Sequence, residues 1–490
     1  MNLKINGNIK PYYVQTLAMI FFPGARFPET VEEGDDVVWA ILDLDETDDG
    51  VTASVTLRQG EREECADSVR SWTDEREKDI KIAAGDAFMK AGEAFTGFRP
   101  PWGILTGVRP AKVATEIMES GKTPEEAAAV IAKDYYVNPV KAKLAADVSV
   151  AESRLITPEK RKQCSVYVGI PFCPSRCAYC SFVSYTSPGL LKLIPEYLTA
   201  LAANIDEIFD VIRMTGMDVA SVYIGGGTPT ILTADQLDFL LGKITSHVTS
   251  LEEFTLEAGR PDTITADKLR VAKSYGVDRI NCNTQTLNDE VLSKIGRAHT
   301  AQMFFEAYEV AKASGIPHIN VDLIAGLPYD TTESFVNTID KVIALDPENI
   351  TVHTFSVKRS SEFKTEGRFD RSSVIASESV DYSQKALGDA GYLPYYMYRQ
   401  KNTVRNLENV GYAKPGHEGL YNIYMMEEIH SIFAAGASSV TKLVSLPDED
   451  GNVRIERLFQ PKYPYEYLGR GDGKHKPDDL RKAAEEFFAI

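Results

Sequence analysis

Beyond residue 160 the chain alternates short apolar stretches with longer amphipathic ones. In the first short stretch the β-branched residues Val166, Val168 and Ile170 favour a strand. Strands that alternate with helical stretches are typical of βαβ units and of a parallel sheet. We therefore predict six strands, at residues 166–170, 220–224, 253–257, 278–282, 319–324 and 349–355.

Amphipathic stretches of helical length separate these strands. The clearest of them cover residues 195–214, 234–248, 301–314 and 333–345. Six βα units fit an incomplete parallel (β/α)6 barrel, which is an α/β fold. In such a barrel the functional residues are expected at the carboxyl ends of the strands.

The first part of the chain follows a different pattern. Strand-like stretches at residues 37–44 and 52–57 come first, and helical periodicity begins near Asp79. The chain is long enough for two or three domains. We predict an N-terminal α/β domain of unknown role at 1–160, a partial barrel at 161–358, and a C-terminal helical and loop region that covers the substrate at 359–490.

The composition of the chain limits its partners and its location. Of its 490 residues 43% are hydrophobic and 25% charged, which is ordinary for a globular protein. A formal net charge of −18 repels phosphate backbones and argues against nucleic-acid binding. Neither a long apolar run nor an apolar signal segment at the start is apparent. We expect a cytoplasmic protein, away from the membrane, whose cysteines stay reduced.

Three of the six cysteines lie within eight residues, directly after the first predicted barrel strand. Cys173, Cys177 and Cys180 can wrap one face of a [4Fe-4S] cluster, which usually takes four thiolates. Because Cys164 and Cys282 lie elsewhere in the pattern, one iron is left for a small ligand with an amine and a carboxylate. A structural zinc site is the alternative, but zinc ligands usually come as two separated pairs.

Other polar motifs follow the ends of the next predicted strands. The run Gly225–Thr228 lets backbone amides approach a ligand closely. Glu257 closes the third strand, and Asp322 lies among apolar residues, where a carboxylate is costly unless it binds something.

Taken together, these motifs resemble the radical S-adenosylmethionine (SAM) superfamily. Over residues 164–440 the chain is similar to the oxygen-independent coproporphyrinogen III oxidase group, and in particular to its longer coproporphyrinogen dehydrogenase-like branch. The resemblance implies that three residues hold the cluster-bound SAM, namely Tyr167, Gly226 and Glu257. It further implies a second SAM molecule, held by Tyr179, Gly227, Thr228, Gln285, Arg297 and Asp322. A structural ion pair between Arg297 and Asp322 is the alternative for these two residues.

The resemblance also implies a reaction. Reductive cleavage of SAM gives a 5′-deoxyadenosyl radical, which takes a hydrogen atom from a propionate of coproporphyrinogen III. Loss of carbon dioxide then leaves a vinyl group, and two such steps give protoporphyrinogen IX. A reduced flavodoxin or ferredoxin is the implied electron donor.

Departures from the family pattern keep two other functions open. Phe182 stands where the oxidases carry a fourth cysteine, as it does in haem-trafficking relatives. Those relatives carry a His-Asn pair where this chain has Tyr421-Asn422, although His417 or His430 could substitute. Gly169 replaces a usual histidine. The alternatives are a haem carrier and a radical SAM enzyme acting on another tetrapyrrole, such as a haem-degrading methyltransferase.

A tetrapyrrole with four carboxylates needs cations around an apolar floor. Arginine suits this task, because its planar fork binds a carboxylate through two contacts. The aromatic run at 392–398 could form a ligand wall, or it could be core. The Trp102 turn similarly could contact a partner or pack between domains. The candidate cations are Lys358, Arg359, Lys364, Arg399, Lys401 and Arg405.

Overall fold

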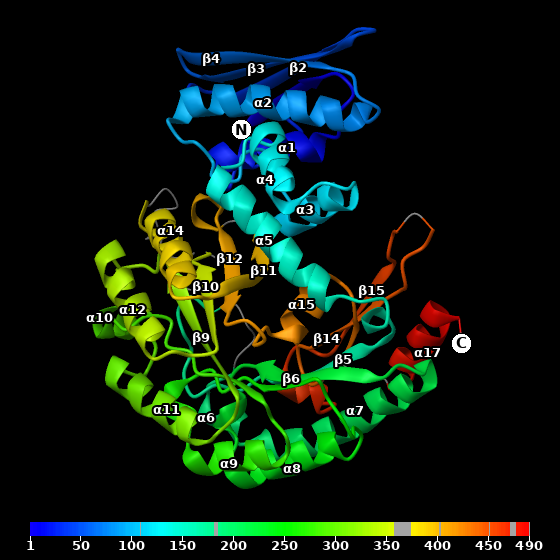
Figure 1. Ribbon diagram of the computed structural model, residues 1–490, viewed down its shortest axis with the longest axis vertical. Coiled ribbons are helices and arrows are strands. Elements are labelled where there is room, and N and C mark those ends of the chain that lie inside the picture. The colour runs from blue at the N-terminus through cyan, green and yellow to red at the C-terminus, as the bar shows by residue number, and fades with distance from the viewer. Residues whose placement is uncertain are drawn as a thin grey trace. The chain divides into compact units, whose positions relative to one another are not determined.

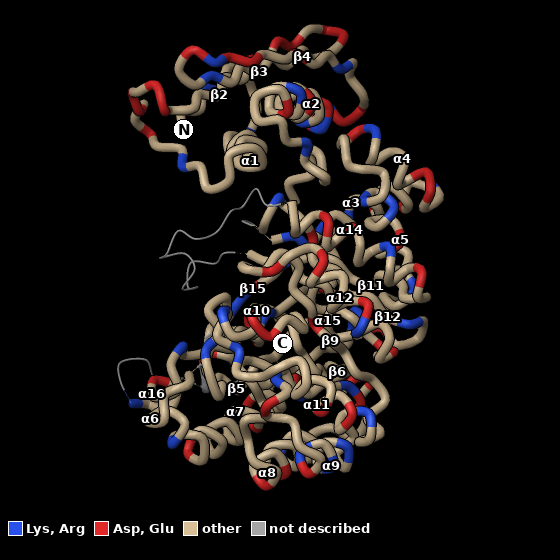
Figure 2. Tube along the Cα trace, turned by 90° about the vertical axis from the view of Figure 1, so that its left-hand side faces the viewer, with Lys and Arg blue, Asp and Glu red and all other residues tan. Residues whose placement is uncertain are grey.

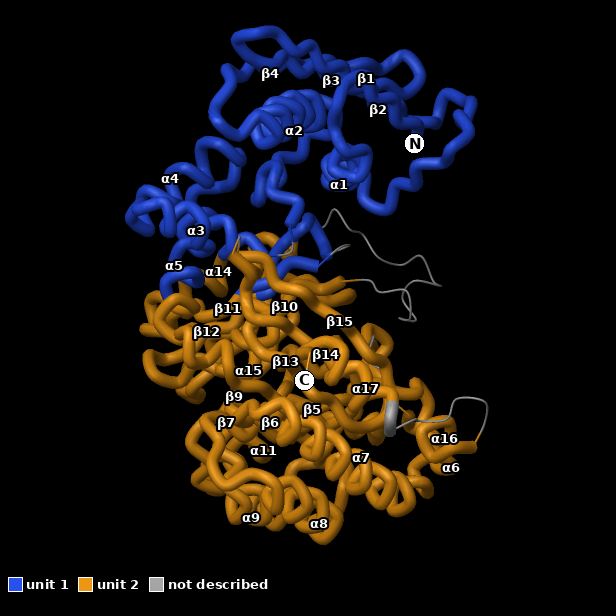
Figure 3. The backbone as a smooth tube through the Cα atoms, turned by 90° about the vertical axis from the view of Figure 1, so that its right-hand side faces the viewer, with its two compact units in different colours: residues 1–150, 370–374, 397–409 blue, residues 151–369, 375–396, 410–490 orange. Residues whose placement is uncertain are grey.

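The structure is a computed structural model that describes residues 1–107, 109–180, 185–356, 374–400, 403–449, 451–470 and 477–489. It divides into two compact units (Figure 3). The first unit comprises Met1–Val150, Met397–Asn409 and a short piece that ends at Val374. The second unit holds the rest of the described chain. A segment from late in the sequence therefore belongs to the N-terminal unit, which the sequence pattern did not suggest.

The first unit is built on a four-stranded sheet in the order β1-β2-β3-β4, with α1 and α2 on one face (Figure 1). Strand β1 pairs with β2 in parallel, and the other pairs are antiparallel. In β3 alternate side chains from Val51 to Leu57 are buried, as expected for a sheet with one covered face. The elements are β1 (Asn2–Asn6), α1 (Pro11–Phe21), β2 (Trp39–Glu46), β3 (Gly50–Gln59), β4 (Arg62–Ser71), α2 (Arg76–Thr96), α3 (Pro110–Glu119), α4 (Pro124–Asp134) and α5 (Pro139–Leu155).

A buried ion pair fixes the late segment within this first unit. Lys141 Nζ lies 2.8 Å from Glu408 Oε1, and the two side chains are 3% and 0% exposed. Trp102 Nε1 donates to Glu408 Oε2 over 2.6 Å. Trp102 is thus a buried core residue within the first unit, and not a residue that packs between domains as expected.

Arg399 is part of the same buried group, which corrects its expected role as a propionate ligand. The residue is 4% exposed, and its guanidinium donates to the carbonyl oxygens of Leu105 and Gly107. It lies 5.5 Å from the centre of the Trp102 ring. Arg405 lies 4.4 Å from the ring of Phe98 in the same unit. The prediction was wrong for Arg399, because its charge already has buried partners; the other candidate cations Lys358, Arg359, Lys364 and Lys401 lie outside the described residues.

An eleven-stranded sheet, in the order β11-β12-β10-β9-β8-β7-β6-β5-β13-β14-β15, is built mainly from residues of the second unit. Strands β5 to β10 are parallel neighbours in chain order, and helices cover their outer face (Figure 1). Each of the six predicted strands overlaps one of them, and the sheet order does not close on itself. The incomplete parallel barrel is therefore confirmed. The strands are β5 (Cys164–Ile170), β6 (Val219–Gly226), β7 (Glu253–Leu256), β8 (Arg279–Asn281), β9 (His318–Ala325) and β10 (Asn349–Thr354).

Helices connect these strands as the amphipathic pattern predicted. Five of them begin at a Thr or Asn residue whose side chain accepts a backbone N–H, a common way to satisfy the first turn. The helices are α6 (Pro188–Leu191), α7 (Ile194–Thr215), α8 (Ala234–Thr245), α9 (Ala266–Ser274), α10 (Asp289–Lys294), α11 (Ala301–Ala313) and α12 (Thr332–Ala344). No described helix has the length and apolarity that crossing a membrane requires.

The C-terminal part contains more strand than the sequence suggested. Strand β13 is buried along its whole length, so it lacks the alternation that marks a half-buried strand. Tyr392, Tyr395 and Tyr396 are at most 6% exposed, which supports the core interpretation of that aromatic run. The elements are α14 (Val374–Asp389), β11 (Leu393–Arg399), β12 (Glu408–Ala413), α15 (Leu420–Met426), β13 (Ser431–Ala435), β14 (Val440–Val444), β15 (Ile455–Phe459), α16 (Pro464–Tyr467) and α17 (Pro477–Phe488).

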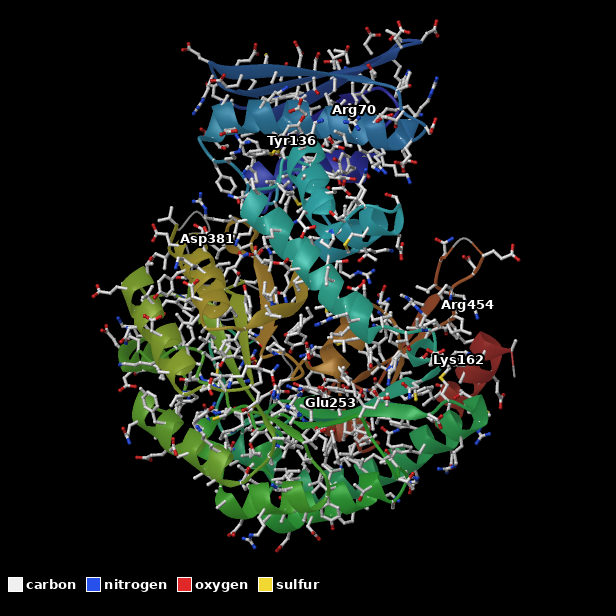
Figure 4. All side chains as sticks on the ribbon, in the orientation of Figure 1. Arg70, Tyr136, Lys162, Glu253, Asp381 and Arg454 are labelled. Carbon is white, nitrogen blue, oxygen red and sulfur yellow. The ribbon has the colours of Figure 1, made fainter. Side chains whose placement is uncertain are left out.

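Glu253 anchors α15 at the amino end of β7 (Figure 4). Its carboxylate accepts the backbone N–H groups of Leu420 and Tyr421 over 2.7 and 3.2 Å, and Arg279 Nε over 3.2 Å. All four groups belong to the second unit. This buried network fixes α15 close to the strands that carry the candidate site.

Candidate functional site

The cysteine loop begins where β5 ends. The amide of Cys173 donates to the carbonyl of Tyr185 over 3.1 Å, and the amide of Cys180 donates to the carbonyl of Cys177 over 3.0 Å. Cys173 and Cys177 are buried, and Cys180 is partly exposed. Burial raises the pKa of the Cys173 thiol to about 11, so this thiol becomes a ligand only when an electropositive group displaces its proton.

The glycine run at the end of β6 lies against the cysteine loop. Gly226 adopts a φ of 115°, which only glycine adopts without strain. The amides of Gly227 and Thr228 each donate over 2.8 Å, to Ile170 and Phe172. A Cβ on Gly227 would lie 2.9 Å from the Cys173 sulfur. Thr228 Oγ1 lies 3.2 Å from the same sulfur.

Arg297 ties the loop to the segments that follow β7 and β8. Its guanidinium donates to the hydroxyl of Tyr179 over 2.9 Å, and to the carbonyls of Gly259 and Asn283 over 3.2 and 2.7 Å. The side chain is 7% exposed. With the Cys177 sulfur 4.0 Å from Nη1, four acceptors therefore hold a buried cation beside the cysteine loop.

Arg297 and Asp322 do not form an ion pair in the described structure, so that alternative is wrong. Instead Asn283 lies between them. Its carbonyl accepts from Arg297, and its side-chain amide donates to Asp322 Oδ2 over 2.7 Å. Asn320 donates to the other oxygen of Asp322 over 2.7 Å. Although burial would raise the pKa of Asp322, His353, whose Nε2 lies 3.8 Å away, and the hydrogen bond from Asn320 outweigh burial and hold it below its usual value.

Gln285 occupies a strained backbone position next to this carboxylate. Its φ is 72°, in the left-handed region that a residue with a Cβ rarely adopts. Its amide donates to the carbonyl of Asp322, and its carbonyl accepts from Ile324, both over 3.0 Å. Two hydrogen bonds to β9 thus hold Gln285 in this strained backbone conformation. Backbone strain of this kind is typical of functional sites.

The carboxyl of Glu257 lies near Asp322, but its pKa is raised and not lowered. Burial, together with the Asp322 carboxylate, raises the pKa of Glu257 to about 8, despite hydrogen bonds from the Gly226 amide and the Tyr223 hydroxyl. At neutral pH the pair therefore holds one negative charge, on Asp322. The Tyr167 ring stacks on the Tyr223 ring with centroids 6.1 Å apart.

The structure places all twelve residues expected from the sequence at the carboxyl side of β5 to β9 or along those strands. It also adds residues that the sequence analysis missed as site residues: Tyr223, Asn320, His353 and Tyr421. Tyr421 stacks on Tyr223 with centroids 4.7 Å apart. For Asn320 and His353 the available signal was the run of polar side chains at alternate positions of β9 and β10, which share one face of the sheet.

The sequence matches the radical SAM superfamily over residues 167–342. It is 35% identical to the oxygen-independent coproporphyrinogen-III oxidase-like protein HemZ of Bacillus subtilis, over 97% of this chain and 95% of that protein. The chain belongs to this radical SAM family. It is also 32% identical to the heme chaperone HemW of Bacillus subtilis, over 56% of this chain and 70% of that protein.

Among solved structures the chain is similar to coproporphyrinogen III oxidase from Escherichia coli. The sequence identity is 20% and the TM-score 0.47, over 70% of this chain and 82% of that one. Proteins of the radical SAM superfamily use a [4Fe-4S] cluster and SAM.

The residues of the site fit both groups. No three His, Cys, Asp or Glu side chains among the described residues are placed to share a single ion, as a zinc site requires. A four-iron cluster has no such requirement, because each thiolate binds a different iron. Gly227 packs directly against the cysteine loop, where a Cβ would lie 2.9 Å from the Cys173 sulfur. The carboxyls of Glu257 and Asp322 suit the hydroxyls and the ammonium group of SAM.

Proposed function

We propose that the chain oxidatively decarboxylates the propionate side chains of coproporphyrinogen III, giving protoporphyrinogen IX. Each conversion removes one hydrogen atom, one carbon dioxide and one electron from the substrate. When bound, the cluster and SAM supply the 5′-deoxyadenosyl radical that takes the hydrogen atom. The remaining electron passes to an external acceptor.

The chain's own residues would bind and orient these partners. Cys173, Cys177 and Cys180 would hold the cluster. Glu257, held by Gly226 and Tyr223, offers a neutral carboxyl to ribose hydroxyls. Asp322 remains ionised within its amide network and offers its charge to a cationic group. The apolar strands behind these residues exclude water, which a radical reaction requires.

The observation that carries this proposal over a haem carrier concerns the histidines. At the position of the carriers' His-Asn pair, Tyr421 is 5% exposed and packs on Tyr223. His430 is fully buried, and its two ring nitrogens contact Ser165 Oγ at 2.8 Å and the Lys160 carbonyl at 2.9 Å. His417 Nδ1 lies 3.0 Å from His318 Nδ1. His430 therefore has both ring nitrogens engaged and offers neither to haem iron, whereas the contact of His417 engages Nδ1 alone.

Haem carriage is the second candidate function. It is supported by the similarity to HemW heme chaperones and by Phe182, which lies outside the described residues. A radical SAM enzyme that acts on another tetrapyrrole remains the third.

Anaerobic turnover distinguishes these functions. The reconstituted chain is incubated with dithionite, SAM and coproporphyrinogen III, and protoporphyrinogen, carbon dioxide and 5′-deoxyadenosine are measured. We expect two carbon dioxide molecules for each protoporphyrinogen formed. Cys177→Ala should abolish the cluster absorbance and product, whereas Cys164→Ala, at a buried cysteine of β5, is the matched control and should retain both. Stoichiometric haem binding without consumption of SAM would support the carrier instead, and 5′-deoxyadenosine without decarboxylated porphyrin would support another tetrapyrrole substrate.

A further inference from the structure

A buried pair of opposite charges lies beside the cysteine loop, and neither residue belongs to the site described above. Arg260 follows strand β7, and Asp262 lies in the short 3₁₀ turn Pro261–Thr263. The Nε and Nη2 groups of Arg260 donate to the two carboxylate oxygens of Asp262 over 2.9 and 3.1 Å. The two side chains are 4% and 16% exposed. Two parallel bonds of this kind fix the plane and the direction of the guanidinium.

The third nitrogen of this guanidinium contacts the cysteine loop itself. Arg260 Nη1 donates to the Ser175 hydroxyl over 2.8 Å and to the Ser175 carbonyl over 3.3 Å. Ser175 lies midway between Cys173 and Cys177 in the sequence. Arg260 is also close enough to Cys173 to act on it electrostatically. The charged pair is therefore joined directly to the loop that carries the proposed cluster ligands.

Side-chain hydrogen bonds hold the turn that carries this pair. The Thr263 hydroxyl donates to the carbonyl of Arg260 over 2.9 Å. The Thr230 hydroxyl donates to the carbonyl of Ala258 over 2.7 Å. Both threonines are buried. The positions of the two charges relative to the cysteine loop are therefore fixed by the packing of the barrel.

Burial makes these charges act more strongly than charges on the outer helices. Figure 2 shows acidic and basic residues along α8 and α9, where Asp238 and Arg270 are exposed and water screens them. Water is largely excluded around Arg260, so its charge acts over several ångströms with little screening. Arg297, with Nη1 4.0 Å from the Cys177 sulfur, is a second buried guanidinium beside the loop.

Reduction of a cluster at this loop adds negative charge to a site that three thiolates already make negative. The potential of such a cluster depends on its net charge and on its surroundings. A nearby cation stabilises the reduced form, and a nearby carboxylate opposes it. We propose that Arg260 and Asp262 tune the reduction potential of the cluster in opposite directions, so that Arg260 raises the potential and Asp262 lowers it.

Both residues are positioning residues, because they act on the cluster through the loop and through their charge. In the reduction that they affect, one electron passes from an external reductant to the cluster, and no proton or group is transferred. The inference uses the cluster alone and does not depend on the identity of the tetrapyrrole substrate.

The test measures the midpoint potential of the full, reconstituted chain under anaerobic conditions, without SAM or substrate. Dithionite and redox mediators set the potential, and the reduced cluster is counted by electron paramagnetic resonance. In Arg260→Gln we expect the equilibrium constant for reduction to fall at least 10-fold, which lowers the potential by about 59 mV. Glutamine keeps an amide donor but has no charge, and it leaves Asp262 without its counter-charge. In Asp262→Asn we expect a rise of similar size.

A double variant separates the effect of charge from the effect of damaged packing. Arg260→Gln combined with Asp262→Asn leaves no unpaired buried charge, and its potential should lie between those of the single variants. If Arg260→Gln alone binds too little iron to measure, the double variant is compared with Asp262→Asn, and the loss of the guanidinium should lower the potential at least 10-fold in the same constant. Arg270→Gln removes an equal charge from the surface of α9 and should keep the wild-type potential.

Potentials that shift in the same direction in the two single variants would overturn the inference, as would wild-type potentials in both. Either result would leave the pair a purely structural role in holding the loop. Because the titration needs neither SAM nor coproporphyrinogen III, it succeeds or fails independently of the proposed decarboxylation, which the turnover experiment tests.

Discussion

Arg297 donates a 2.9 Å hydrogen bond to the hydroxyl of Tyr179, which joins the cysteine loop to the segment after α10. Tyr179→Phe removes one of the four acceptors of a buried guanidinium. A lost hydrogen bond to a buried charge costs about 1–3 kcal/mol. We expect the cluster to form but to be lost faster to a chelator, as measured by its absorbance. Tyr382→Phe, which removes a bond to Asp340 on the outer helices, should leave the chelation rate unchanged.

The bridge through Asn283 predicts how Arg297 and Asp322 respond to replacement. Because the two charges do not pair but share Asn283, Arg297→Lys and Asp322→Asn should each reduce SAM cleavage at least 10-fold, and their effects on the free energy of unfolding should be partly additive, with a coupling of about 0.5–3 kcal/mol. Urea denaturation of both single variants and the double variant measures this. A loss of about 3–5 kcal/mol in each single variant that the double variant does not increase would indicate an ion pair after all.

Gly227→Ala tests the close approach of the glycine run to the cysteine loop. The new Cβ would lie 2.5 Å from the Phe172 carbonyl oxygen and 2.9 Å from the Cys173 sulfur, so the loop must shift. We expect a large fall in the iron bound per chain after reconstitution. At Gly189, on nearby α6, a Cβ meets nothing within 4 Å, and Gly189→Ala should bind iron as the wild type does. Equal iron content in the two variants would contradict the described packing.

The raised pKa of Glu257 predicts that the stability of the protein without SAM depends on pH. Its pKa rises from the usual 4.5 to about 8 on folding, so the folded chain binds this proton more tightly than the unfolded chain. The resulting stabilisation is complete below pH 4.5 and is lost as the pH rises towards 8. Between these two pH values the melting temperature should fall less for Glu257→Gln than for the wild type. Glu309→Gln, exposed on α11, is the control, and parallel curves for all three proteins would be contrary to expectation.

The ion pair of Lys141 and Glu408 predicts a strong effect on the first unit. Glu408→Gln leaves a buried ammonium without its counter-charge, which costs about 3–5 kcal/mol. Tryptophan fluorescence reports on this unit alone, because Trp39, Trp72 and Trp102 are the only tryptophans of the chain. We expect a lower urea midpoint by this signal. Lys143→Ala, which breaks an exposed pair with Asp147, should change the free energy of unfolding by about 0.5 kcal/mol or less.

The sequence by itself determined the barrel and the identity of its cofactors. Alternation of apolar and amphipathic stretches is a local property, because helix and strand periods are set within about ten residues, so six strands could be placed before any contact was known. The spacing of Cys173, Cys177 and Cys180 is local in the same sense. These features depend only on neighbours along the chain.

Only the tertiary structure decided which polar groups meet. Arg297 and Tyr179 are 118 residues apart, and Trp102 and Glu408 are 306 apart. Such pairs depend on how strands and loops are brought together, and neither residue carries a local sign of its partner. Arg399 shows the consequence. Its sequence neighbours give no sign that it is buried, yet carbonyls 292 and 294 residues away hold it buried in the first unit. Burial is a property of the assembled core, and so the sequence could predict the type of site but not which charges were free to serve it.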